Sequence, residues 1–225
     1  MLTLFYLTVL GTMAAVLIAV ILLAIGFKHQ QLYLKWLTVL LCFSFLSDLS
    51  SAVASSLGVG YVNQMAYPYS ILSTPVFCLV FYYMIGSTRL KLPLVMLCGL
   101  YTSILIIDLA WLHPGQMPSY SNTMQSLIII VLAVIYFWVL MRQMPTAHIQ
   151  QLASFWIASA FFFSYSGKLI IYSVRSYLIE YLGDSMIILW SFHNLLSIIA
   201  NIMLCYAAWL SLKPVLKRIQ PAKSL

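Results

Sequence analysis

Residues 30–36, Gln-Gln-Leu-Tyr-Leu-Lys-Trp, begin a long apolar segment that carries a single acid, Asp48, near its centre. The pattern returns 120 residues later as Gln-Gln-Leu-Ala-Ser-Phe-Trp at 150–156, and the segment that follows carries Lys168. Aligning 30–61 with 150–181 needs no gap and gives nine identities: Gln30, Gln31, Leu32, Trp36, Phe43, Ser44, Leu49, Ser56 and Tyr61. We interpret this pattern as an internal duplication whose matching segments carry opposite charges at the equivalent position.

The composition excludes an ordinary soluble domain. Of 225 residues, 64% are hydrophobic and only 7% are charged, and the mean hydropathy is +1.02. Soluble domains are usually about a quarter charged, so too few polar side chains exist to cover a surface in water. The net charge of +7 comes from basic residues in short polar stretches. This distribution favours anionic lipid headgroups over nucleic acid as the partner.

Seven apolar segments are separated by short polar stretches. About 20 apolar residues are needed to cross the core of a bilayer. The segments are 4–26, 32–58, 69–86, 92–112, 124–141, 152–178 and 186–212. The sequence therefore predicts an all-α membrane protein with seven transmembrane helices in a single domain, 1–225.

The basic residues in the polar stretches lie on one side of the predicted membrane. This side has Lys28, Lys35, Arg89, Lys91, Arg142, Lys213, Lys217, Arg218 and Lys223, and the opposite stretches have no Lys or Arg. Short loops rich in Lys and Arg stay cytoplasmic. We therefore expect the N-terminus outside, the C-terminus in the cytoplasm and, in a bacterium, the inner membrane as the location.

The duplication predicts two three-helix repeats, 1–91 and 122–213, joined by a linker helix at 92–112. A single linker helix makes the two repeats parallel, related by an axis along the membrane normal. The alternative is convergence, because loop and interfacial residues obey the same membrane rules in both halves.

Asp48 and Lys168 are the central charges of their helices. Charged residues inside a membrane usually face the interior of the bundle and are paired. Ser44 and Ser51 share the helical face of Asp48, and Ser164 shares that of Lys168. Three interpretations stay open: a structural bridge, a site for a proton, an ion or a polar ligand, and a pair that does not meet.

Two further polar groups lie within apolar segments. Asn194 and Asn201 fall on one face of the last segment beside His193, where they serve either helix-to-helix hydrogen bonding or a ligand-facing wall. Asp108 and Arg175 lie near the outer boundary of their segments. They form an outer pair there, or Arg175 extends outward to the headgroups by itself.

The sequence predicts no catalytic residue, cofactor or metal site. A single histidine well inside a segment cannot hold zinc, and neither a His-Glu-x-x-His motif nor a Ser-His-Asp arrangement is present. The four cysteines are isolated, so we expect them to be packing residues. A retinal pigment is disfavoured because 186–212 contains no lysine.

Two stretches resemble a family of bacterial seven-helix proteins. They are Phe-Trp-Ile-Ala-Ser-Ala at 155–160 with Tyr-Ser-Gly at 165–167, and Trp-Ser-Phe-His-Asn-Leu-Leu at 190–196 with Asn-Ile-Met-Leu at 201–204. Members of this family occur alone and as the N-terminal membrane regions of sensor histidine kinases. The resemblance implies a sensor with its N-terminus outside and a cytoplasmic C-terminus. It covers the last two segments, and family members often have a small neutral polar residue where Lys168 stands.

We therefore expect a signalling-associated or sensor-type membrane protein without catalytic activity, acting with a cytoplasmic or membrane signalling partner. The alternative is a small-solute or ion transporter built on triple-helix repeats. The three-plus-one-plus-three plan is similar to that of the small sugar transporters, but their Pro-Gln loop motif is missing. A structural subunit of a larger membrane complex is the third hypothesis.

Overall fold

The structure is a computed structural model of the chain. It describes the backbone of residues 2–56, 66–86, 88–108, 119–143, 148–182 and 186–219. Side chains are described for 5–54, 69–86, 92–108, 121–143, 148–173 and 189–213.

Seven long α-helices make up nearly all of the described chain, and two short 3-10 helices, Phe27–His29 and Ile149–Gln151, precede α2 and α6. The long helices are α1 (Leu2–Gly26), α2 (Leu32–Ser56), α3 (Ala66–Ile85), α4 (Thr88–Ile107), α5 (Ser119–Gln143), α6 (Ala153–Leu182) and α7 (Met186–Ile219). No strand occurs in the described ranges. The predicted all-α class is confirmed.

Five of these helices are long and apolar enough, among the described residues, to cross a membrane. The spans are Phe5–His29, Leu32–Ala54, Ser121–Gln143, Ala153–Ser173 and Leu189–Lys213. Two shorter apolar helices, Tyr69–Ile85 and Leu92–Ile107, accompany them. A helix satisfies its backbone hydrogen bonds internally, which is why an apolar chain of this kind is helical in a bilayer. The chain thus has the build of a multi-pass membrane protein.

Several helix boundaries differ from the sequence prediction. Residues 87–91 were expected to form a loop, but α4 begins at Thr88. The turn is shorter because Gly86 adopts a positive φ of 65°, which ends α3 abruptly. In addition, α5 begins at Ser119, α6 continues to Leu182, and α7 continues through Lys213 to Ile219. Hydropathy marks only the apolar part of a helix, whereas the hydrogen-bonded helix extends into polar sequence.

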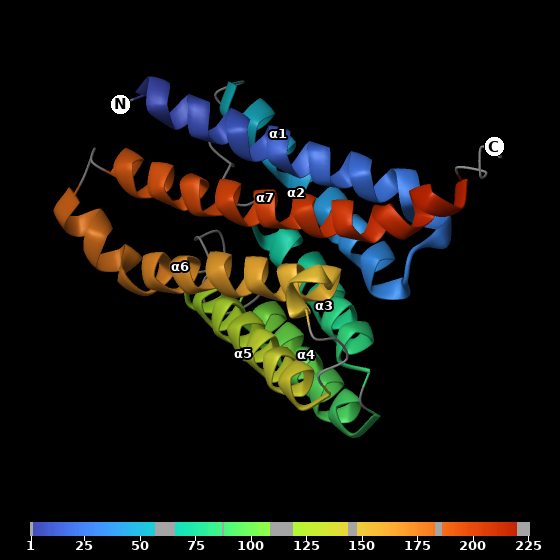
Figure 1. Ribbon diagram of the computed structural model, residues 1–225. Helices are drawn as coiled ribbons and strands as arrows, with labels where there is room; N and C mark the ends of the chain where they lie inside the picture. Colours follow the sequence, from blue (N-terminus) through green and yellow to red (C-terminus); the bar gives the residue numbers. More distant parts are fainter. Residues whose placement is uncertain are drawn as a thin grey trace.

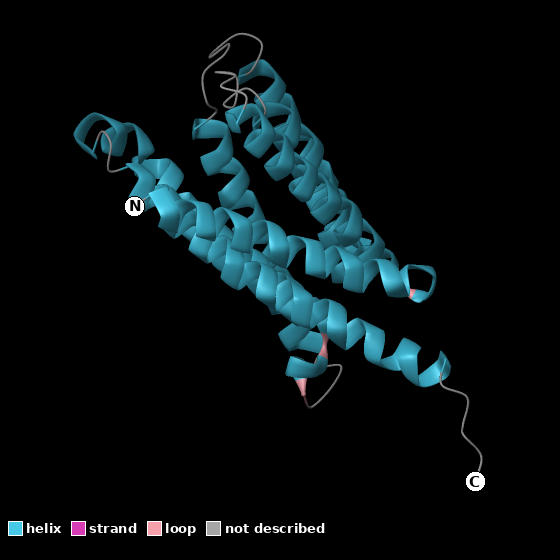
Figure 2. Ribbon diagram, turned by 90° about the horizontal axis from the view of Figure 1, so that it is seen from above, coloured by secondary structure: helices cyan, strands magenta, loops and turns pink. Residues whose placement is uncertain are grey.

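The helices pack so that the first and last are neighbours. Helix α7 lies between α1 and α6 (Figure 1), and α6 also packs against α5. Helix α3 contacts α2, α4 and α5. Helix α1 begins and α7 ends at opposite ends of the bundle (Figure 1 and Figure 2). Each half of the chain therefore packs its helices consecutively, α1–α2–α3 and α5–α6–α7. Two contacts join the halves: α1 packs against α7, and α3 packs against α5.

Small residues allow close approach at the helix interfaces. On α7, Ala207 and Ala208 are fully buried, and so is Ala19 on α1. A Cβ added at Gly11 of α1 would lie 3.1 Å from the Ile198 side chain of α7. Without a hydrophobic driving force between helices in lipid, such close van der Waals packing is the main source of association.

Aromatic side chains fill the centre of the bundle between α3 and α6. The Phe77 ring centroid lies 5.0 Å from that of Phe161 and 5.3 Å from that of Tyr165, both in edge-to-face geometry. The outward faces of the helices carry large exposed apolar side chains such as Leu7 (66% exposed). An apolar outer surface of this kind is suited to lipid.

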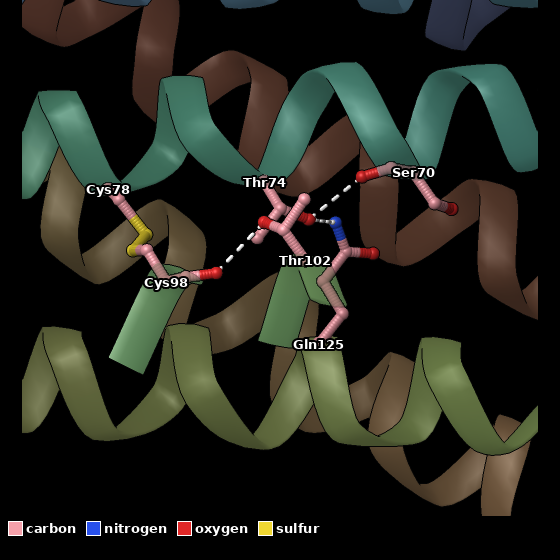
Figure 3. The surroundings of a disulfide bond; sticks show 6 residues. All are labelled: Ser70, Thr74, Cys78, Cys98, Thr102 and Gln125. Atoms are coloured by element: carbon pink, nitrogen blue, oxygen red, sulfur yellow. Dashed lines mark hydrogen bonds between the residues drawn. A yellow bond between two sulfur atoms is a disulfide. The ribbon is translucent and has the colours of Figure 1, made fainter. Parts of the chain in front are cut away.

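A disulfide joins Cys78 of α3 to Cys98 of α4, with their Cα atoms 6.5 Å apart (Figure 3). The prediction that all four cysteines are packing residues is wrong for this pair, because the short turn between α3 and α4 brings the two thiols together. Cys42 and Cys205 are free.

Candidate ligand-binding cavity

A cavity of about 820 Å³ lies between α1, α2, α3, α6 and α7. Its walls come mainly from 5–16 of α1, 40–52 of α2, the middle of α6 at 161–172, and 190–204 of α7. The cavity therefore belongs to the end of the bundle where α1 begins. Its volume falls in the range of about 300–1,000 Å³ that is typical of small-molecule sites.

All eight central residues singled out from the sequence line this one cavity. They are Ser44, Asp48, Ser51, Ser164, Lys168, His193, Asn194 and Asn201. Within each helix these residues lie on one face, because positions three, four or seven apart share a face of an α-helix. The sequence could place each stripe on its own helix, and the structure adds that the three stripes converge.

The remaining wall is mainly apolar. Helix α1 contributes Phe5, Val9, Leu10, Met13 and Val16 to it. A cavity with a polar side and an apolar side is suited to an amphipathic molecule. This division follows from the sequence of α1, which has a mean hydropathy of 2.7 and no charged residue in its first 26 positions.

Asp48 and Lys168 bring opposite charges to the same cavity. The two side chains interact electrostatically. Neither of these two described side chains makes a direct ion pair, and the Lys168 ammonium instead lies over the Tyr165 ring, 4.7 Å from its centroid. The structure therefore brings both charges into the bundle interior, while their predicted energetic coupling stays a prediction.

Aromatic and imidazole rings surround the Lys168 end of the cavity. Tyr69, Tyr172 and Trp190 line it. The His193 ring lies 5.6 Å from that of Trp190 and 6.2 Å from that of Tyr172, measured between centroids. Nδ1 of His193 is buried and has no hydrogen-bond partner among the described residues. Buried polar atoms are normally satisfied, so this nitrogen is open to a bound molecule.

Asn194 takes part in helix packing. Its Nδ2 donates to Thr8 Oγ1 at 3.4 Å, and its backbone oxygen accepts from Thr12 Oγ1 at 3.3 Å. These bonds join α7 to α1, so for Asn194 the structure supports helix-to-helix bonding. Asn201, which is 9% exposed, lines the cavity.

A second, smaller cavity of about 120 Å³ adjoins the first. Both are lined by Tyr69, Tyr165, Lys168, Tyr172 and Trp190. The smaller one adds Ser70 of α3 and the amide side chains of Asn122 and Gln125 of α5. Lys168 thus faces the large cavity, which contains Asp48, and also the smaller, amide-lined cavity.

A buried hydrogen-bond network behind the smaller cavity was not predicted from the sequence. Nε2 of Gln125 donates to Thr74 Oγ1 at 2.9 Å (Figure 3) and to Ser73 Oγ at 3.2 Å. The Ser70 hydroxyl donates to Asn122 Oδ1 at 3.2 Å. The available signal was the polar run 119–126, most of which precedes the predicted segment 124–141 but forms the first turns of α5.

The predicted outer pair is described only at one partner. Asp108 is buried (5% exposed), and its carboxylate accepts a hydrogen bond from Ser121 Oγ. The Tyr101 hydroxyl donates to the Ser121 backbone oxygen at 2.9 Å, so α4 and α5 are joined here. The Arg175 side chain lies outside the described residues, and its pairing with Asp108 stays a prediction.

Within the described ranges, no group of three or more His, Cys, Asp or Glu residues is placed to hold a metal ion. No protein-family model, curated protein or solved structure matches the chain.

Proposed function

We propose that the protein is a sensor-type bacterial inner-membrane protein, which binds a small amphipathic molecule in the large cavity and passes its occupancy to a signalling partner. The observation that carries the proposal is the cavity itself: about 820 Å³, apolar on the α1 side and lined by Asp48, Lys168 and His193 on the other. Intramembrane ionisable residues facing a cavity usually mark a functional site.

The distribution of basic residues supports an outward-facing cavity. Lys28, Lys35, Arg142 and Lys213 lie near the end of α1, the start of α2 and the last parts of α5 and α7. The positive-inside rule makes that end cytoplasmic, and the cavity lies toward the opposite end. Arg142 lies over the Trp138 ring, 4.2 Å from its centroid, a combination suited to the headgroup region.

A transporter is the second candidate, and the arrangement of the helices as two similar halves favours it. The consecutive packing of α1–α2–α3 and α5–α6–α7, and the matching contacts α1–α7 and α3–α5, are what two parallel repeats around an axis between α2 and α6 would produce. Asp48 on α2 and Lys168 on α6 would then face the same cavity from equivalent positions.

Ligand binding can be tested with a matched pair of substitutions. Ser197 lines the cavity and donates to the His193 backbone oxygen at 3.0 Å, whereas Ser103 is exposed on α4 and donates to the Gly99 oxygen at 2.9 Å. Both lose the same kind of intrahelical bond on replacement by Leu. We expect a metabolite that binds in the cavity to raise the Tm of the wild type and of Ser103→Leu, but not the Tm of Ser197→Leu.

Flux separates the sensor from the transporter. Any molecule that raises the Tm of the wild type and of Ser103→Leu, but not that of Ser197→Leu, is added in labelled form to proteoliposomes containing the protein. Binding without accumulation supports the sensor, and uptake that Ser197→Leu abolishes supports the transporter. If no molecule from a broad metabolite library discriminates between the two leucine variants, the ligand-binding proposal fails.

A further inference from the structure

Among the described residues that line the large cavity, Asp48 and Lys168 carry opposite charges, and an apolar wall faces them. From this arrangement we infer that its ligand is a small zwitterion with an apolar group, an apolar amino acid or a short apolar peptide, whose carboxylate binds at Lys168 and whose ammonium binds at Asp48. The inference rests on the proposed ligand-binding function and specifies the chemistry of that same site.

Charge balance is the first argument. The charges of the Asp48 carboxylate and the Lys168 ammonium cancel, so these two lining residues together carry no net charge. A ligand with one charge would leave a net charge buried in the membrane, which is costly. A zwitterion keeps the cavity neutral and gives each protein charge a partner.

The surroundings of each charge provide the second argument. Ser44 and Ser51 lie one turn before and after Asp48 on α2 and line the same cavity, where their hydroxyl oxygens can accept from an ammonium. Around Lys168, the buried and unpartnered Nδ1 of His193 adds a second polar group. The Lys168 ammonium is held over Tyr165 rather than in a direct ion pair with Asp48, so a ligand can lie between the two charges.

The α1 wall accounts for the apolar group. Val9, Leu10 and Met13 face the cavity without any charged neighbour on their helix. An aliphatic or aromatic side chain bound there would be removed from water, and its burial would favour apolar over polar amino acids.

The test compares a zwitterion with analogues that lack one charge. L-Leucine and the dipeptide Leu-Leu are the zwitterionic probes. The probe 4-methylpentanoate keeps only the carboxylate of leucine, and 3-methylbutylamine keeps only the ammonium. Binding to the full-length protein in lipid nanodiscs is followed by titration calorimetry and by Tm. We expect at least one zwitterion to bind, and both single-charge analogues to bind at least about tenfold more weakly.

Two variants provide an independent reading. Asp48→Asn removes the carboxylate and leaves the Lys168 ammonium, so 4-methylpentanoate should bind more tightly relative to the zwitterion. With Lys168→Met the preference should reverse toward 3-methylbutylamine. These are changes of preference within one variant, so a loss of stability does not imitate them, and the wild-type comparison stands even where a variant fails to fold.

Each result bears on one of the two proposals. If a single-charge analogue binds the wild type as tightly as the zwitterions, the zwitterion inference is overturned while ligand binding stands. The same holds when no zwitterion binds but a library compound of another class discriminates between Ser197→Leu and Ser103→Leu. If no compound of any class discriminates between those variants, both proposals fail together.

Discussion

The Lys168 ammonium lies over the ring of Tyr165, one helical turn earlier on α6, at 4.7 Å from its centroid. The ring holds the ammonium at the cavity wall, where it interacts electrostatically with Asp48 on α2. Such a cation–π contact offsets part of the desolvation of a buried lysine, although less fully than a direct ion pair. Lys168 is therefore stabilised in the bundle and still open to a ligand.

A double-mutant cycle measures the coupling between the two charges. Asp48→Asn and Lys168→Met should each destabilise the protein, because each strands the opposite charge in the bundle. The double variant should recover part of the loss, with a coupling of about 0.5–3 kcal/mol for interacting residues. The free energies of unfolding of the four proteins decide the matter. Losses that simply add would show that the residues do not interact.

The Gln125 amide should stabilise the contact between α3 and α5. Gln125→Leu removes the donor that Thr74 Oγ1 and Ser73 Oγ accept. Hydrogen bonds between membrane helices contribute about 0.6 kcal/mol on average, and at most about 1.7. We therefore expect a loss of about 0.5–2 kcal/mol in the free energy of unfolding. Gln143→Leu, at the exposed end of α5, is the control, and an equal effect there would contradict a specific role for Gln125.

The Cys78–Cys98 disulfide can be verified by counting thiols. Alkylation of the denatured protein should modify two cysteines before reduction and four after it, because Cys42 and Cys205 are free. Replacing Cys78 and Cys98 together by Ser should lower the free energy of unfolding by about 2–4 kcal/mol. Cys42→Ser is the comparison that keeps the disulfide. Four modified cysteines without reductant would refute the bond.

The sequence was sufficient to predict the helical class and the placement of the cavity residues on their helices. Charges within apolar segments are rare, so Asp48 and Lys168 were conspicuous. Gln125 and Ser70 were not, because uncharged polar residues near a helix end look the same in the sequence whether they face a loop or a neighbouring helix. The disulfide could not be predicted either, since two isolated cysteines pair only when the turn at Gly86 sets the register of α3 against α4. Convergence of three stripes on one cavity likewise depends on packing.

Orientation in the membrane is open to a reporter experiment. The nine basic residues on one side against none on the other predict a cytoplasmic C-terminus. Alkaline phosphatase fused after Leu225 should therefore be inactive, and green fluorescent protein fused there should fluoresce. An active phosphatase would reverse the assigned side of every loop and place the cavity toward the cytoplasm.

Gly167 should be required for the close packing of α6 on α7. A Cβ built at this position would collide with the Leu196 side chain of α7. We expect Gly167→Ala to destabilise the protein by about 1 kcal/mol, the lower end of the cost of overpacking, because the Leu196 Cδ1 atom that it meets is the end of a half-buried side chain that can shift. Gly99 of α4 is the matched control, because a Cβ there meets nothing within 4 Å. Gly99→Ala should be neutral or stabilising, since Ala is the better helix former. Combining Gly167→Ala with Leu196→Ala should restore part of the lost stability, because the shorter side chain makes room for the added methyl group. If the two losses instead accumulate, the contact between Gly167 and Leu196 does not account for the effect.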